Sequence, residues 1–60
     1  MKIINTEVIF LSAKEADTNA DVNAVLCTLD NGDEVVLVNV DAKYPTLADN
    51  IASYLKGQVL

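Results

Sequence analysis

The chain alternates between three apolar runs rich in Val, Ile and Leu and more polar connections, and it then shows helical spacing. The runs span residues 3–11, 22–29 and 34–40, and each has the length and composition of a β-strand. The polar segment 12–21 has no large apolar side chain and fits either a mobile loop or a short helical turn. We therefore predict a single domain over residues 1–60 of the α+β class, with a three-stranded antiparallel sheet in β-β-β-α order.

The clearest local signal is the Asp-Asn-Gly-Asp sequence at positions 30–33, between the second and third runs. Asn-Gly supplies the positive φ angles of a two-residue type I′ hairpin turn. That turn would pair Cys27 with Val36, Val25 with Val38 and Leu26 with Leu37. A three-residue loop with Gly32 in a bulge would slide the pairing by one residue and exchange the faces of the third strand. The long segment 12–21 also leaves the first strand free to lie beside either the second or the third.

Both faces of this hairpin are largely apolar in either register. In the first register, one face holds mainly valines and the other holds Val22, Ala24, Leu26, Val35 and Leu37 beside Thr28 and Asn39. Strands that are covered on both sides have such nearly continuous apolar runs, whereas a solvated face alternates apolar and polar residues. The single predicted helix is roughly 15 Å long and covers one face at most. Something other than this helix must therefore cover the second face.

The helix is predicted over residues 47–56 and packs across one face of the sheet. Thr46 with Asp49 three positions later resembles a capping box, and Gly57 marks the end of the helix. The inward stripe is expected to consist of Leu47, Ile51, Tyr54 and Leu55. The apolar tail, residues 58–60, is expected to pack against the domain.

Composition narrows the possible chemistry. The 60 residues include nine acidic side chains against four lysines, a net charge of −5, and no His, Arg or Trp. The lone Cys27 permits no intramolecular disulfide and indicates a cytoplasmic protein, since small secreted domains are dense in cysteines. No apolar run has the length of a signal peptide or a membrane span. With one small core and no covalent or metal staple, association is the remaining source of stability.

No catalytic, cofactor or metal site is predicted, and we expect no enzymatic activity. Cys27 lies in mid-strand without a base beside it, and the serines likewise lack a basic partner. Residues 17–21 match the first ligand positions of a calcium loop, but Val22 replaces its glycine and Thr28 its chelating glutamate. The negative charge argues against direct nucleic-acid binding. Mimicry of DNA fits the sign of the charge, but the carboxylates are too sparse to favour it.

Two groups of residues are candidates for binding. Asp30, Asp33 and Glu34 bring three carboxylates to the hairpin tip, where a basic partner or a hard cation would bind, although tight turns select Asp for conformational reasons alone. The interface candidates are Leu26, Val35 and Leu37 on the second sheet face, together with Tyr44. Tyr44 precedes Pro45 and is either an exposed anchor or a packing residue at the start of the helix.

The function that these features favour is a non-catalytic protein-interaction module. We expect a homodimer or larger oligomer that binds another macromolecule as an inhibitor or regulator. Small acidic chains are common among phage proteins directed against host or defence enzymes, which would place such a protein in the host cytoplasm. The alternatives are a ligand-sequestering oligomer and a structural subunit of a larger assembly, for which the same sheet surface would be a permanent contact.

Overall fold

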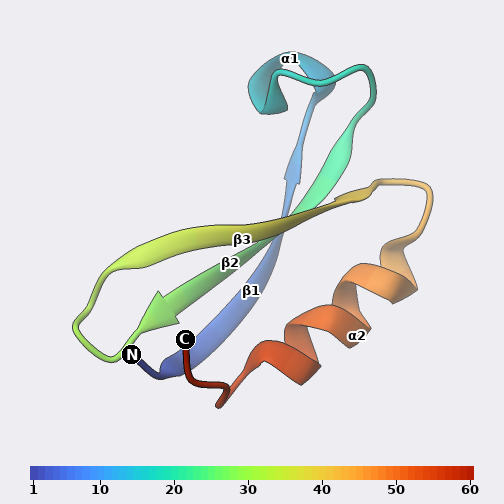
Figure 1. The fold of residues 1–60 in the computed structure, drawn as a ribbon. Coiled ribbons are helices and arrows are strands. Elements are labelled where there is room, and N and C mark those ends of the chain that lie inside the picture. Colours follow the sequence, from blue (N-terminus) through green and yellow to red (C-terminus); the bar gives the residue numbers. More distant parts are fainter.

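The computed structural model describes residues 1–60 as a three-stranded sheet with one long and one short helix (Figure 1). The elements are β1 (Ile3–Leu11), α1 (Ala13–Ala16), β2 (Val22–Leu29), β3 (Glu34–Asp41) and α2 (Pro45–Leu55). The sheet is antiparallel in the order β1-β2-β3, and α2 packs against one of its faces. The predicted α+β architecture is confirmed, and β1 lies beside β2. The longest helix has eleven residues, and none is long and apolar enough to cross a membrane.

The β2–β3 hairpin turns through a three-residue loop rather than the two-residue turn. The Leu29 N–H donates to the Asp33 carbonyl at 2.8 Å, and the Gly32 N–H donates to the Leu29 carbonyl at 2.9 Å. Gly32 has φ +91°, in the region that favours glycine. The loop therefore consists of residues 30–32, as in the alternative with a glycine bulge.

A β-bulge inside β3 then restores the other register. Leu26 pairs with Val36, whereas the next pair is Val25 with Val38, so Leu37 is the extra residue on β3. The predicted pair of Val25 with Val38 is confirmed, and the predicted pair of Leu26 with Leu37 is wrong. Each of the two registers thus describes one half of the hairpin.

The three-residue loop also changes which valine of β3 faces α2. Val35 lies opposite Cys27 and packs against the buried cluster under the helix. The predicted position of Val35 on the second face is wrong, as is the predicted pairing of Cys27 with Val36. The three-residue loop places Val36 opposite Leu26, the position that the two-residue turn would have given to Leu37.

Helix α2 rests on the sheet through alanines. Ala48 and Ala52 are buried, while Ile51 and Leu55 are half-buried beside them. The spacing of these four positions is i, i+3, i+4 and i+7, which is one face of a helix. Small side chains allow a close approach, and the Thr6 hydroxyl of β1 donates to the Ala52 carbonyl at 2.9 Å.

Two residues of the predicted inward stripe point to solvent instead. Leu47 is 49% exposed and Tyr54 is 70% exposed. The helix also begins earlier than predicted, at Pro45, with Tyr44 as an N-cap that makes no side-chain cap bond. The expected capping box from Thr46 is therefore wrong, because Thr46 lies inside the helix.

The capping box of this chain occurs in α1, which is a single helical turn. The Ser12 hydroxyl accepts from the Glu15 N–H at 3.3 Å, and the Ser12 N–H donates to Glu15 Oε1 at 3.0 Å. Asp17 ends the turn in the left-handed conformation, with φ 54°. The segment between β1 and β2 thus takes the helical-turn alternative.

The C-terminal tail runs beside the beginning of β1, so the two termini are neighbours (Figure 1). The Ile3 N–H donates to the Gln58 carbonyl and the Gly57 N–H to the Ile3 carbonyl, both at 2.8 Å. Val59 and Leu60 nevertheless stay 73% and 59% exposed. Backbone bonds rather than side-chain burial hold the tail in place.

Candidate interaction surface

The sheet face opposite α2 is called the open face here. Directly paired residues share a face of a sheet, and the core residues of β2 alternate with those of the open face. The paired rows of the open face, from the hairpin tip toward α1, are Asn5, Thr28 and Glu34; Glu7, Leu26 and Val36; Ile9, Ala24 and Asn39; and Leu11, Val22 and Asp41. Apart from α2, the element that contacts the sheet is the single-turn α1, which lies against β1.

Apolar side chains at the centre of the open face remain in contact with solvent. Val36 is 45% exposed, and the bulged Leu37 beside it is 40% exposed. Leu26 and Ile9 are half-buried, whereas Ala24 is fully buried by its neighbours. The predicted second apolar face therefore exists, with Val36 in place of Val35.

Carboxylates lie along the border of this face. Glu7 occupies the edge strand β1, while Glu34 and Asp41 are the first and last residues of β3. None of the paired positions of the face is a lysine. The open face thus has an apolar centre and an acidic border.

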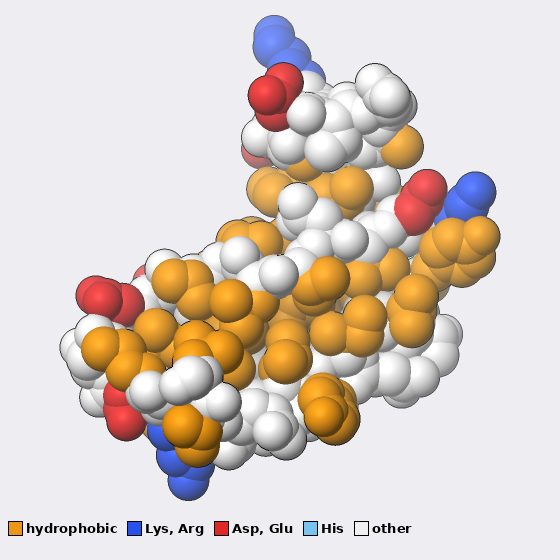
Figure 2. Space-filling view, viewed as in Figure 1, with side chains coloured by type: hydrophobic (Ala, Val, Ile, Leu, Met, Phe, Trp, Pro, Cys, Tyr) orange, Lys and Arg blue, Asp and Glu red, His pale blue; other side chains and the backbone are white.

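The hairpin tip adds further negative charge next to this border (Figure 2). Asp30, Asp33 and Glu34 are all exposed. Asp33 stabilises the turn, since its N–H donates to Asn31 Oδ1 and its Oδ2 accepts from Asn31 Nδ2, both at 2.9 Å. No three acidic or cysteine side chains are grouped so as to hold a metal ion. The geometry of the tip is that of a turn with outward-pointing charge.

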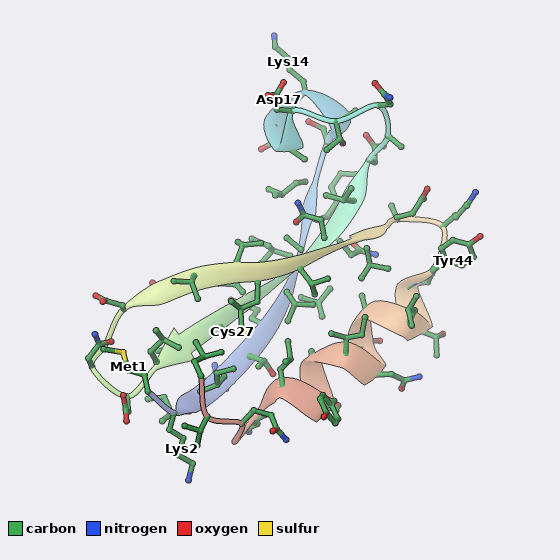
Figure 3. The ribbon with its side chains drawn as sticks, in the orientation of Figure 1. Met1, Lys2, Lys14, Asp17, Cys27 and Tyr44 are labelled. Carbon is green, nitrogen blue, oxygen red and sulfur yellow. The ribbon has the colours of Figure 1, made fainter.

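Tyr44 does not join the other interface candidates. It lies at the beginning of α2, beyond the end of β3 (Figure 3), and is 52% exposed. Lys43 Nζ lies 5.3 Å from the centre of its ring, a cation–π distance. The structure therefore pairs Leu26 with Val36, leaves the bulged Leu37 exposed next to Val36 on β3, and places Val35 and Tyr44 elsewhere.

Cys27 is enclosed in the core between β2 and α2. Its side chain is fully buried, and burial raises the pKa of its thiol above the ordinary value. Its one polar contact within 4.0 Å is the Val25 carbonyl. This environment favours the neutral, unreactive thiol of a core residue.

A shallow hollow of about 530 Å³ lies between β1 and α2. It is lined by Thr6, Val8, Asp49, Ala52, Ser53 and Lys56. The Thr6 hydroxyl is already bonded to the helix backbone, and Asp49, Ser53 and Lys56 are exposed. This mixture of one exposed cation, one exposed anion and hydroxyls defines no particular ligand.

The comparisons add no family assignment. No protein-family model matches the chain, and no curated protein or solved structure is significantly similar to it. The open face is accordingly interpreted from its own residues. The three-residue loop was the one feature of the sequence that could have identified Val36, because that register puts Val36 opposite Leu26.

Proposed function

We propose that this chain is a non-catalytic protein-interaction module that works as a homo-oligomer and inhibits or regulates another macromolecule by binding it. The observation that supports the proposal is the open face, where Leu26 is paired with the exposed Val36 and the adjacent bulged Leu37 is exposed as well. Contiguous exposed apolar patches on small proteins mark interaction surfaces. A lone, buried cysteine fits a reducing compartment, and we place the module in the cytoplasm.

The charge distribution indicates the chemistry of the macromolecular partner. The chain has a net charge of −5, and carboxylates occupy both the border of the open face and the hairpin tip. Such a field attracts a basic surface and raises the rate of encounter with it. The partner is therefore a macromolecule with a Lys/Arg-rich surface, and its binding weakens as salt screens the attraction.

Affinity capture with matched charge variants tests this proposal. The tip variant combines Asp30→Asn with Glu34→Gln, two side chains that make no hydrogen bond within the chain, and leaves the turn-stabilising Asp33 in place. The control variant combines Asp17→Asn with Asp49→Asn. It also removes two negative charges, but from the C-cap of α1 and from α2 instead of the hairpin tip. Asparagine also tolerates the left-handed conformation at position 17.

The tagged wild-type protein is exposed to a lysate of its native cell at low salt and washed at rising salt. We expect the wild type and the control variant to retain the same protein, the tip variant to lose it, and high salt to release it. Equal retention by the two variants would show that net charge alone acts. The absence of any specifically retained macromolecule at low salt would refute the proposed function.

A further inference from the structure

The core under α2 is small for a chain that has to fold without a disulfide bond or a structural metal ion. Nine of the 60 residues are buried, and the largest fully buried side chains are Ile3, Val25 and Cys27. The single cysteine is free, and no metal-ligand cluster is present. Domains of this length bury too little apolar surface for comfortable stability and commonly gain the remainder by oligomerisation. A second copy is a partner that is available wherever the chain is made.

The size of the open face suits a small dimer. Eight-residue strands at about 3.3 Å per residue, three of them about 4.8 Å apart, give a face of about 26 by 14 Å, or roughly 370 Å² in flat projection. The accessible area is larger because it follows the relief of the side chains. An interface near the lower size limit buries about 500 Å² on each copy, which is about one eighth of the 3928 Å² surface of this chain. A stacked copy therefore has to use the whole face and forms a dimer that dissociates on dilution.

The two edges of the sheet are poorly suited to self-association. The β1 edge is bonded to the tail at Ile3, which donates to Gln58 and accepts from Gly57. The β3 edge is interrupted by the bulge at Leu37, and bulges are devices that prevent edge-to-edge pairing. The tail covers the beginning of the β1 edge and the bulge interrupts the β3 edge, so the open face is the larger uninterrupted surface.

The charges of the open face are compatible with a two-fold stack. Its carboxylates, Glu7, Glu34 and Asp41, lie on the edge strand or at strand ends, so stacked faces bring apolar centres together and leave the carboxylates at the perimeter. Two chains of charge −5 still repel each other at low salt. Such a dimer tightens as salt rises, which is the opposite of binding to a basic partner.

From these observations we propose that the open face is covered by the open face of a second copy, in a two-fold, sheet-on-sheet dimer with the two α2 helices on the outside. This inference rests on the proposed function, because it names the first occupant of the same surface. Stacked sheets of this kind pack about 10 Å apart with their strands within about 30° of each other. The acidic border and the hairpin tips stay accessible around the junction for a basic macromolecule.

Light scattering after size-exclusion chromatography tests the dimer over a wide concentration range at low and high salt. We expect twice the chain mass of 6.5 kDa at high concentration, with a dissociation constant that falls as salt rises. Val36→Lys should raise that constant by about 100-fold or more, because the dimer would bring two ammonium groups into its apolar contact. Leu47→Lys, at a similarly exposed position on α2, is the matched control and should remain dimeric.

A labelling experiment decides the matter should Val36→Lys fail to fold. Cys27 is fully buried, so a maleimide cannot reach its thiol in the folded chain. Val36→Cys therefore introduces a single accessible thiol on the open face. We expect its labelling to slow as protein concentration rises, whereas Leu47→Cys should react at a constant rate. A wild type that is monomeric at every concentration and salt, with Val36→Cys labelled freely, would overturn the dimer.

The two proposals fail in different ways. A monomer that still captures a basic macromolecule through its acidic tip would refute the second copy, and with it the oligomeric state in the proposed function, but keep the binding of a macromolecule. A concentration-dependent dimer that retains no other macromolecule would keep the dimer and refute the interaction function.

Discussion

Replacing Ala48 by Leu should lift α2 from the sheet. Ala48 is fully buried at the contact between the helix and the strands, so three further carbons have no space there without displacement of a neighbour. Ala and Leu have nearly equal helix propensities, so the helix itself is not weakened by the change. The substitution therefore tests the packing between helix and sheet in isolation.

The expected cost follows from overpacking. Insertion of extra carbons into a packed core costs about 1–3 kcal/mol, and in a chain of this length each kcal/mol lowers the melting temperature by about 4–8 °C. The matched variant is Leu47→Ala at the next position, which exchanges the same two residue types in the opposite direction. Because Leu47 is 49% exposed, its loss should cost about 1 kcal/mol or less.

Urea unfolding followed by circular dichroism measures both variants, at one fixed protein concentration so that association contributes equally. The expected order of stability is wild type, then Leu47→Ala, then Ala48→Leu. If the stripe predicted from the sequence were the buried one, Leu47→Ala would instead cost about 2–5 kcal/mol. That larger cost, or a neutral Ala48→Leu, would contradict the packing described for α2.

Two further predictions concern the turns. Gly32→Ala should lower the free energy of unfolding by about 1–2 kcal/mol in urea melts, because an L residue is strained at φ +91° although nothing lies within 4 Å of the added methyl; an unchanged midpoint would argue against the positive φ of Gly32. Hydrogen bonds from Ser12 lower the pKa of Glu15, so the capping box stabilises α1 above the ordinary pKa of glutamate and is lost as pH falls through the lowered folded-state pKa; NMR titration should show that Ser12→Ala raises the pKa of Glu15, and identical titrations would contradict the box.

The order and type of the large elements could be predicted from local patterns, because three apolar runs and one helical period do not depend on distant contacts. The hairpin register could not be predicted in the same way. Asn-Gly is compatible with both turn lengths, and the structure uses the longer loop at the tip and regains the other register through the bulge at Leu37. The position of a bulge depends on how both faces of β3 pack, and no single residue type in the sequence predicts it.

For the helix, too, local sequence spacing predicted the element itself but not which of its residues are buried by the tertiary structure. Its existence followed from spacing, but the inward stripe was predicted by giving the large apolar residues Leu47 and Tyr54 the buried positions. The structure buries Ala48 and Ala52 instead, because a close helix–sheet contact at Thr6 leaves room for methyl groups only. Side-chain size is a poor guide to burial where backbones approach closely.

The apolar second face was predictable because it does not depend on the register. In either register of β3, one of its two adjacent apolar residues has to lie opposite Leu26, and the pairing observed puts Val36 there. The bulge goes further, since it directs Val35 and Val38 to the core while Val36 and Leu37 remain exposed on the strand. On a face that stays in contact with water, Thr or Lys would be as suitable as Val36 and Leu37, so the exposed apolar side chains do not stabilise a monomer. The uncovered apolar residues of β3 are therefore the observation on which both the proposed interaction function and the proposed dimer rest.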